Sequence, residues 1–514
     1  MDISTKILLP LAMLAAAVML LGTAWVGDDA FITLRVIDNV VNGWGLRFNV
    51  IERVQVFTHP LWLIVITPFY ALTREPMITT MLVSVLLSLA ALWILATRIA
   101  ANVEYGSLLV LAAILSPAIC HFSTSGLETP LTFFLLALFV WQLYRSENIW
   151  VPAAIAGLLF LNRLDMVVLL GPVVVYLLFQ ARGGDRVRVA FAALFPALAW
   201  IIFSVIYYGA PFPNTAYAKL GTGFGTGELI SRGLEYTKDF VLTDPLLALL
   251  IGKAVFDAAR IQHRPTKLLG IGITLYVVYT ITIGGDFMSG RFFAPPGFLA
   301  ICLLARAPAP KWLAKHVKIT GVLAIGVLGV LLVVRMEEQP LFINMIPQNG
   351  IADERRFYYF ETGLVPVVSR WLTDGFEPVP QFGRRGLELK SLWQQDGAPV
   401  VVSAQAIGLR GYYGGSNVHV VDEVALADAF LARLPALPNS RVGHYQRMLP
   451  SGYAETVTSA HPQTSVAALQ PLLYDVTLVT RAPLLAEGRG DAIWRLLSGQ
   501  YHWIYTADIA GVSK

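Results

Sequence analysis

The chain has 514 residues, of which 56% are hydrophobic and 14% are charged, and its mean hydropathy is +0.62. Soluble domains carry about 25% charged residues, so this composition excludes a soluble globular protein and predicts one that crosses a membrane several times. The formal net charge of +4 is spread over loops, and no block of Lys and Arg is dense enough to indicate a nucleic-acid partner.

The first apolar run covers residues 7–26 and follows Lys6. Gly22-Thr23-Ala24 resembles the small-residue site at which signal peptides are cleaved. A run of about 20 residues, however, is long for a signal peptide and right for a membrane span. We therefore expect a signal anchor that is not cleaved, with the N-terminus on the cytoplasmic side.

An acidic pair, Asp28-Asp29, stands where this first run ends. Ionisable groups at membrane depth are costly and usually functional. Arg35 lies two helical turns after Asp28 and falls on the same face if the segment is helical. The pair is therefore the first candidate for an active site. The alternative is that Asp28 caps the helix and Arg35 snorkels to lipid phosphate.

The stretch between Asp29 and Val41 alternates apolar and polar residues at helical spacing, which predicts an amphipathic helix. Asn42-Gly43 supplies its stop. The first external loop, residues 27–59, is expected to lie on the membrane surface. Aromatic residues that suit a belt at the lipid headgroups are Trp44, Phe57 and Trp62.

Further apolar runs predict a polytopic helical protein with about eleven spans, although several runs are shorter than the roughly 20 residues of a perpendicular span. The runs are 60–73, 77–97, 106–120, 131–144, 149–162, 166–180, 189–208, 240–255, 268–283, 294–305 and 318–334. Two cysteines, Cys120 and Cys302, lie in these runs, which favours buried thiols over a disulfide.

Basic loops mark the cytoplasmic side. Their residues are Arg182, Arg186, Arg188, Arg260, His263, Arg264, Lys267, Arg306, Lys311, Lys315 and Lys318. The loops between them, 208–239 and 284–293, are then external, as is everything after about residue 335.

The character of the chain changes near Met336, where apolar runs shorten and Gly, Pro and charged residues return. We expect a membrane module over residues 1–335 and an external mixed α/β domain over residues 336–514. Two segments, 399–403 and 417–421, have the composition of strands, and Gly411–Gly415 between them predicts a turn.

Nine stretches of the chain resemble, in order, the bacterial terminal β-arabinofuranosyltransferase family of the GT-C class of membrane glycosyltransferases, best known from mycobacterial cell-wall arabinan synthesis. They are DDAFITLR (28–35), NGWGLRFN (42–49), ERVQ (52–55), THPLW (58–62), TSGLET (124–129), PNTAYAK (213–219), GGDFMSGRF (284–292), VDEVALAD (421–428) and RVGH (441–444). One departure lies at 425–428, where the family has Gly-Leu-Thr-Asp and this chain has Ala-Leu-Ala-Asp.

The resemblance implies a GT-C fold in the inner membrane of a bacterium, with the active site and the C-terminal domain facing the periplasm. It also implies a reaction. A polyprenyl-phosphate sugar such as decaprenyl-phosphoarabinose donates its glycosyl group, by the resemblance a D-arabinofuranose, to a hydroxyl of an envelope glycan or glycoconjugate. A phosphate leaving group needs no protonation, so one carboxylate base suffices for an inverting displacement, unlike the two carboxylates of glycoside hydrolysis.

By position in the family motif, Asp28 is the leading candidate for this base, and Asp29 is second. The adjacent like charge raises the pKa of one of the two carboxyl groups, which helps that group to act as a base near neutral pH. The donor phosphate needs cations, for which Arg291 and Lys219 lead and Arg35 and His59 follow. Alternatives are an ion pair of Arg291 with Asp286 and snorkelling of Lys219.

Candidates for binding the acceptor or the sugar are Glu128, Asn214, Tyr217 and Asp286. Glu128 also suits an acid at a helix N-terminus, and a turn after Pro213 explains Asn214 and Tyr217 equally well. Arg163 and Asp165 favour a structural pair at the end of a span.

His419, His444 and Asp422 lack the spacing of metal ligands, so no metal site is assigned. No cofactor is assigned either, and a divalent cation beside the acidic pair stays open. The expected partners are the bilayer, the lipid-linked donor and a glycan acceptor. Two other functions also stay open: a flippase or transporter of a lipid-linked sugar, which typically carries charge at the midplane and inverted repeats, and a non-catalytic envelope assembly protein.

Overall fold

The computed structural model describes residues 5–220, 224–337, 340, 345–374, 379–438, 440–441 and 443–505, so Val442 of the RVGH stretch lies outside the described residues. The chain divides into two compact units, each built from three stretches. The first unit holds Met1–Gly27, Met77–Ala197 and Thr226–Pro378, and the second holds Asp28–Pro76, Leu198–Gly225 and Val379–Lys514. The predicted ranges 1–335 and 336–514 concern membrane topology and stay a prediction.

The regular elements described in the first unit are helices. They are α1 (Thr5–Thr23), α4 (Met77–Ile94) with the π-helical turn η1 (Leu95–Ile99), α5 (Val103–Leu115), α6 (Pro117–Phe122), α7 (Thr129–Arg145), α8 (Trp150–Asn162), α9 (Met166–Gln180), α12 (Thr226–Thr243), α13 (Pro245–Arg260), α14 (Arg264–Thr282), η2 (Arg291–Phe293), α15 (Ala294–Arg306), α16 (Lys311–Glu337), α17 (Glu354–Thr362) and α18 (Leu364–Asp374). Helix α10 (Gly184–Tyr208) contributes residues to both units.

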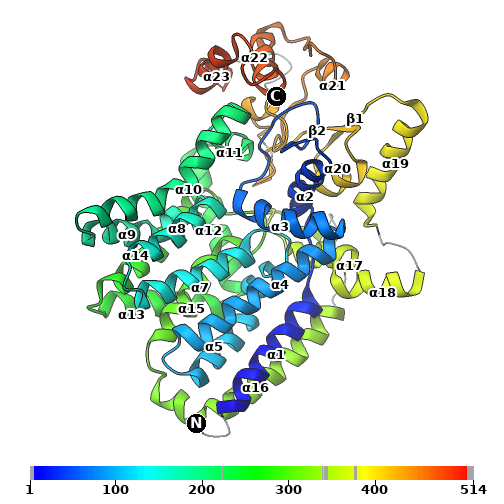
Figure 1. Cartoon of the computed structure of the whole chain (residues 1–514). Coiled ribbons are helices and arrows are strands. Elements are labelled where there is room, and N and C mark those ends of the chain that lie inside the picture. Colours follow the sequence, from blue (N-terminus) through cyan, green and yellow to red (C-terminus); the bar gives the residue numbers. More distant parts are fainter. Residues whose placement is uncertain are drawn as a thin grey trace. The chain divides into compact units, whose positions relative to one another are not determined.

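The helices of the first unit pack side by side. Helix α1 lies against α5 and α16 (Figure 1), α4 lies against α7, and α9 lies against α14. Both cysteines are free and buried in this unit, as predicted. Several of these helices are apolar on every face, which is typical of helices inside a large core or a membrane.

Within the described residues, four helices are long and apolar enough to cross a membrane: Met77–Ile99, Gly184–Tyr208, Arg264–Thr282 and Lys315–Glu337. A fifth results if Ile7–Thr23 and Asp28–Val41 are taken together as one broken span. Shorter apolar helices of 10–17 residues include Pro60–Thr73, Val103–Leu115, Trp150–Asn162 and Met166–Gln180. Membrane-type helices are therefore confirmed, and the number of about eleven spans stays a prediction.

The second unit is mixed. Its elements are α2 (Asp28–Val41), α3 (Pro60–Thr73), α11 (Asn214–Leu220), α19 (Gln381–Asp396), β1 (Val400–Ala404), α20 (Gly408–Gly414), β2 (Val418–Asp422), η4 (Leu431–Arg433), α21 (Tyr453–Thr456), η5 (Ala467–Leu469), α22 (Gln470–Arg481), α23 (Arg489–Leu497) and η6 (His502–Tyr505). Helix α20 packs against both α2 and α19.

Strands β1 and β2 form a parallel pair, with Val400 opposite Val418 and Ala404 opposite Asp422. The two predicted strands are thus confirmed to within one residue. The predicted turn at Gly411–Gly415 is wrong, because most of this segment is helix α20. Parallel strands cannot be joined by a tight turn and need a crossover connection. The sequence pattern predicted the positions of the strands but not their parallel direction.

Helix α2 ends at Val41, and Gly43 has a φ of 84°, so the predicted Asn42-Gly43 stop is confirmed. The predicted aromatic belt is only partly right. Trp44 is 47% exposed, whereas Phe57 and Trp62 are buried. The Phe57 ring packs edge-on against Trp200 with ring centroids 5.9 Å apart, so burial in the core takes the place of the headgroup contact.

Candidate active site

The acidic pair opens helix α2. The Asp28 side chain is only 6% exposed, and its two carboxylate oxygens each accept a backbone hydrogen bond. Gly408 N–H donates to Oδ2 at 2.9 Å, and Leu409 N–H donates to Oδ1 at 2.8 Å. Asp28 is therefore held by the first turn of α20. Asp29 is partly exposed, and among the described residues no hydrogen bond or ion pair engages its carboxylate.

Burial raises the pKa of Asp28 from 3.8 to about 6, since a desolvated carboxylate is less stable in its charged form. The hydrogen bonds from Leu409 and Gly408 oppose this rise, and the neighbouring charge of Asp29 adds to it. The predicted effect of the like charge is thus present but secondary. A carboxyl group with this pKa is ionised at neutral pH. Its pKa is also close enough to neutral pH for the group to accept a proton efficiently.

Arg35 lies on the buried face of α2. Its Nη2 donates to the carbonyl oxygens of Val418 at 2.7 Å and Gly415 at 3.3 Å, and its guanidinium lies 4.3 Å from the centre of the Phe48 ring. The side chain is 2% exposed, so the alternative of snorkelling to lipid is wrong. These contacts tie α2 to β2, and a role for Arg35 toward the donor phosphate stays a prediction.

A hydrogen-bonded chain that the sequence did not reveal lies near the C-terminal end of α2. The Tyr70 hydroxyl donates to Asp38 Oδ1 at 2.7 Å and is 2.7 Å from the Tyr412 hydroxyl. It joins α2, α3 and α20 through polar groups. Asp38 follows Arg35 by three residues on an amphipathic helix, which is the only sequence signal for it.

His59 precedes the first residue of α3 and is 4% exposed. Its Nε2 lies 2.9 Å from the Thr33 hydroxyl, and its Nδ1 lies 3.3 Å from the Thr58 hydroxyl. The ring therefore links α3 to α2. Its predicted contact with the donor phosphate stays a prediction.

Three predicted residues belong to α11. Asn214 Nδ2 donates to the carbonyl oxygens of Ala425, Leu426 and Asp428, at 2.9, 3.1 and 3.1 Å. This amide holds a loop in which Ala425 has a φ of 64°, the left-handed region that favours glycine. The hydrogen-bond donors of the Asn214 side chain are thus taken up by backbone carbonyl oxygens. Lys219 is partly exposed at the last turn of the helix.

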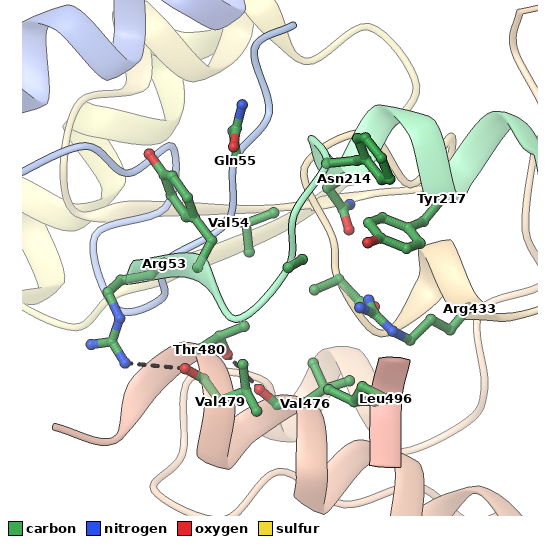
Figure 2. A pocket seen from close by; sticks show the side chains of 14 residues that line it. Arg53, Val54, Gln55, Asn214, Tyr217, Arg433, Val476, Val479, Thr480 and Leu496 are labelled. Atoms are coloured by element: carbon green, nitrogen blue, oxygen red, sulfur yellow. Dashed lines mark hydrogen bonds between the residues drawn. The ribbon is translucent and has the colours of Figure 1, made fainter. Parts of the chain in front are cut away.

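Tyr217 of α11 lines a small pocket of the second unit, with a volume of about 20 Å³. Figure 2 shows its ring facing the Arg433 side chain, whose guanidinium lies 5.1 Å from the ring centre. Arg53, at another wall, donates from Nε to the Tyr207 carbonyl and from Nη2 to the Val479 carbonyl, both at 3.1 Å. Sequence reasoning placed Arg53 in a motif but not in this pocket.

The first unit brings three other predicted residues together. Arg291 Nη1 lies 3.4 Å from Asp286 Oδ2, and its Nη2 lies 3.9 Å from Glu128 Oε1. The open alternative of an Arg291–Asp286 ion pair is thus confirmed. The two acids are 3% and 2% exposed, so the cluster is buried, where unpaired charge would be costly.

Arg163 completes this buried cluster. Its Nη1 donates to Glu128 Oε1 at 3.0 Å, and its Nη2 donates to Asp165 Oδ2 at 2.6 Å. The expected Arg163–Asp165 pair is confirmed. The Glu128 side chain makes no capping hydrogen bond to helix α7, which begins at the next residue, and its carboxylate turns to arginine instead.

Further buried acids lie in the second unit. Asp422 accepts backbone hydrogen bonds from Val424 at 2.9 Å and Ala427 at 2.8 Å, and burial raises its pKa to about 7. Asp428 accepts from the Tyr453 hydroxyl at 2.8 Å. Both organise the VDEVALAD stretch. In the part of the chain that is described, no group of three or more His, Cys, Asp or Glu side chains is arranged to hold a metal ion.

No protein-family model matches the chain. It is 26% identical over 520 aligned residues to a terminal β-(1→2)-arabinofuranosyltransferase of Mycobacterium tuberculosis. This alignment covers 83% of this chain and 81% of that protein. It is 29% identical over 341 residues to a protein of the same name from Corynebacterium glutamicum, which covers 55% of this chain and 48% of that one. The chain thus spans about half the length of the second relative.

Two solved structures are similar. The oligosaccharyltransferase of Archaeoglobus fulgidus matches with a TM-score of 0.50 at 12% identity, over 81% of this chain and 62% of that one. ArnT from Cupriavidus metallidurans matches with a TM-score of 0.48 at 18% identity, over 82% and 86%. The sequence relatives confirm the predicted resemblance, and the first structure supports the predicted GT-C fold class.

Proposed function

We propose that this chain, which resembles terminal β-(1→2)-arabinofuranosyltransferases along 83% of its length, is a membrane glycosyltransferase. It moves D-arabinofuranose from a polyprenyl-phosphate donor to a hydroxyl of an envelope glycan or glycoconjugate. The sequence similarity is the observation that carries this proposal. The buried Asp28 carboxylate at the start of α2 supplies the chemical group that such a reaction needs.

The proposed step is a single inverting displacement at the anomeric carbon. The acceptor hydroxyl gives its proton to Asp28 as its oxygen attacks, and the lipid phosphate leaves with the bonding electrons. The raised pKa of Asp28, about 6, suits a base at neutral pH. Each carboxylate oxygen accepts one backbone hydrogen bond, which fixes its direction and leaves a lone pair for the proton. Asp29 orients the acceptor hydroxyl.

Arg291 is the proposed ligand of the donor phosphate. Its contacts to Asp286 and Glu128, at 3.4 and 3.9 Å, are longer than the 2.7–2.9 Å typical of charge-assisted hydrogen bonds. Arg163, by contrast, is held by Asp165 at 2.6 Å. The Arg291 side chain is 13% exposed, against 6% for Arg163, so Arg291 is the more accessible cation of this cluster, and Asp286 and Glu128 keep it in place. Lys219, Arg35 and His59 are weaker proposals for the same task.

The proposed location is the inner membrane of a bacterium, with about eleven spans and the acidic pair facing the periplasm. The helices that meet the length and hydropathy of a span support membrane insertion. The basic loops that flank α13, α14 and α15 support the orientation.

The deciding experiment is transfer in vitro with purified protein in detergent or nanodiscs. Decaprenyl-phosphoarabinose, other polyprenyl-phosphate sugars and an arabinan acceptor are supplied. Asp28→Asn is expected to lower the rate by about 10²–10⁴-fold, the usual contribution of a general base, with donor binding retained. Asp29→Asn is expected to lower it less. Asp185→Asn, an exposed acid paired with Arg188, is the matched control and is expected to leave the rate unchanged.

Folding of each variant is checked by its thermal unfolding curve and by gel filtration. Unimpaired transfer by Asp28→Asn would remove Asp28 as the base. No turnover by the folded native chain with any lipid-phosphate sugar would instead contradict the enzyme reading and favour a transporter or an assembly protein.

A further inference from the structure

A cavity of the first unit, with a volume of about 300 Å³, lies where α13 and α15 end and α14 begins. None of its lining residues belongs to the Asp28 site, the Arg291 cluster or the Tyr217 pocket. One wall is apolar and is made by Ala254, Ala258, Ile261, Leu303 and Leu304. The rim is polar and is made by Tyr144, His263, Thr266 and Arg306. A cavity that combines apolar lining residues with a cluster of polar ones matches an amphipathic ligand.

The polar rim is organised around Tyr144. The Arg306 guanidinium lies 3.5 Å from the centre of the Tyr144 ring, and the His263 ring is stacked at 5.3 Å between centroids. The Thr266 hydroxyl lies 2.7 Å from the Tyr144 hydroxyl and 2.9 Å from His263 Nδ1. Stacking fixes the plane of a guanidinium and leaves the N–H groups at its edge for an anion.

Arg306 is exposed, and among the described residues no carboxylate or carbonyl oxygen accepts a hydrogen bond from it. The one acid that lines the cavity, Asp257, is paired with Lys253. The rim therefore presents a net positive charge to whatever enters. More positive charge surrounds it, because Arg260 ends α13, Arg264 begins α14 and Arg145 ends α7.

We propose that this cavity binds an anionic phospholipid, with the phosphodiester at Arg306 and His263 and an acyl chain against the apolar wall. A lipid fits better than a soluble phosphate, because most of the lining is apolar and would gain nothing from a small anion. Helix α14 has the length and hydropathy of a span and begins at Arg264. The rim thus lies at the end of a span, where phosphate headgroups are found and where basic pockets between helices bind anionic lipids. The proposal does not depend on the transfer reaction.

The test is lipid binding by the full chain in detergent, measured by native mass spectrometry and by the shift of the unfolding temperature. The probes are phosphatidylglycerol, phosphatidylcholine with matched acyl chains, and glycerol 3-phosphate. We expect phosphatidylglycerol to bind and to raise the unfolding temperature, with phosphatidylcholine and glycerol 3-phosphate at least tenfold weaker. Arg306→Gln is expected to weaken phosphatidylglycerol binding about tenfold, because a charge-assisted phosphate contact is lost.

Two further variants separate a built site from general attraction. Ala307→Trp, at an exposed residue that lines the cavity, keeps every charge but fills the mouth, and it is expected to abolish binding. Arg188→Gln removes an exposed cation that does not line the cavity and is expected to change nothing. Equal binding of the two phospholipids, or unchanged binding by both Arg306→Gln and Ala307→Trp, would overturn the proposal. Tighter binding of glycerol 3-phosphate than of phosphatidylglycerol would overturn the lipid assignment.

Discussion

The backbone N–H of Gly408 donates a 2.9 Å hydrogen bond to Asp28 Oδ2, and a Cβ on Gly408 would overlap the carbonyl oxygen of Asp28. Glycine is required here because α20 approaches α2 backbone to backbone. The contact fixes the direction of the proposed catalytic carboxylate.

Gly408→Ala should therefore push α20 away from Asp28. We expect a loss of roughly 2–3 kcal/mol of unfolding free energy, at the upper end of overpacking effects, together with a loss of transfer. Thermal unfolding and the transfer assay measure the two. Gly490→Ala is the matched control: Gly490 lies in α23 of the same unit with nothing within 4 Å of an added Cβ. It should be neutral or stabilising, and a Gly408→Ala variant as stable as this control would rule out the close approach.

The pKa of Asp28 predicts two opposite trends with pH. The folded pKa of about 6 lies above the reference value of 3.8, so between pH 4 and 6 the folded protein binds more protons than the unfolded chain. The contribution of Asp28 to stability is therefore greatest below pH 4 and falls as pH rises through 6, by on the order of 3 kcal/mol. Asp28→Asn should lack this trend, as measured by the difference in unfolding free energy between native and variant chains across pH 4–7.

Transfer should respond in the other direction. A base must be ionised, so kcat/KM should fall about tenfold for each pH unit below about 6 and level off above it. The pH profile of the native chain measures this. A profile that stays flat between pH 5 and 7 would exclude Asp28 as the titrating base.

Ala425 offers a simple gain in stability. Its φ of 64° costs an L-residue roughly 1–2 kcal/mol, and the related family has glycine at this position. Ala425→Gly should stabilise the chain by roughly 0.5–1 kcal/mol after the extra entropy of glycine in the unfolded chain is subtracted. Ala427→Gly, two residues on at a buried position with no positive φ, should destabilise it. The same sign for both variants would contradict the assigned backbone conformation.

Two variants in the buried cluster around Arg291 distinguish its effect on stability from its effect on donor binding. Arg291→Gln leaves Asp286 with less compensation and should cost roughly 1–3 kcal/mol of unfolding free energy. The double variant Arg291→Gln, Asp286→Asn should recover much of that stability, because the unpaired charge is gone. If Arg291 binds the donor phosphate, KM for the donor should stay raised in both. A donor KM that recovers along with stability would assign Arg291 a purely structural task.

The sequence predicted what depends on short-range pattern. The extent of α2, its stop at Gly43 and the two strands follow from periodicity and turn chemistry. The partners of the charged residues did not follow from it. Asp28 could be placed at the start of a helix, but nothing nearby in sequence indicates that Gly408 and Leu409 satisfy it. Likewise, the sequence around Arg35 indicated a lipid contact, because its true acceptors, Gly415 and Val418, lie about 380 residues further along the chain. Short apolar helices such as α8 and α9 have the composition of membrane spans but not the length. The hydropathy of the sequence therefore does not determine the number of spans.

The make-up of the second unit has a consequence for biogenesis. Asp28 and Leu409, which bond to each other, are 381 residues apart, and the ribosome adds about 5–20 residues per second. Roughly 20–80 s therefore pass between their syntheses. During that interval the polar groups that α2 later buries lack their partners from α20 and β2. A chain truncated before residue 408 should consequently expose this helix to proteases or chaperones, so that quality control can distinguish unfinished molecules from complete ones.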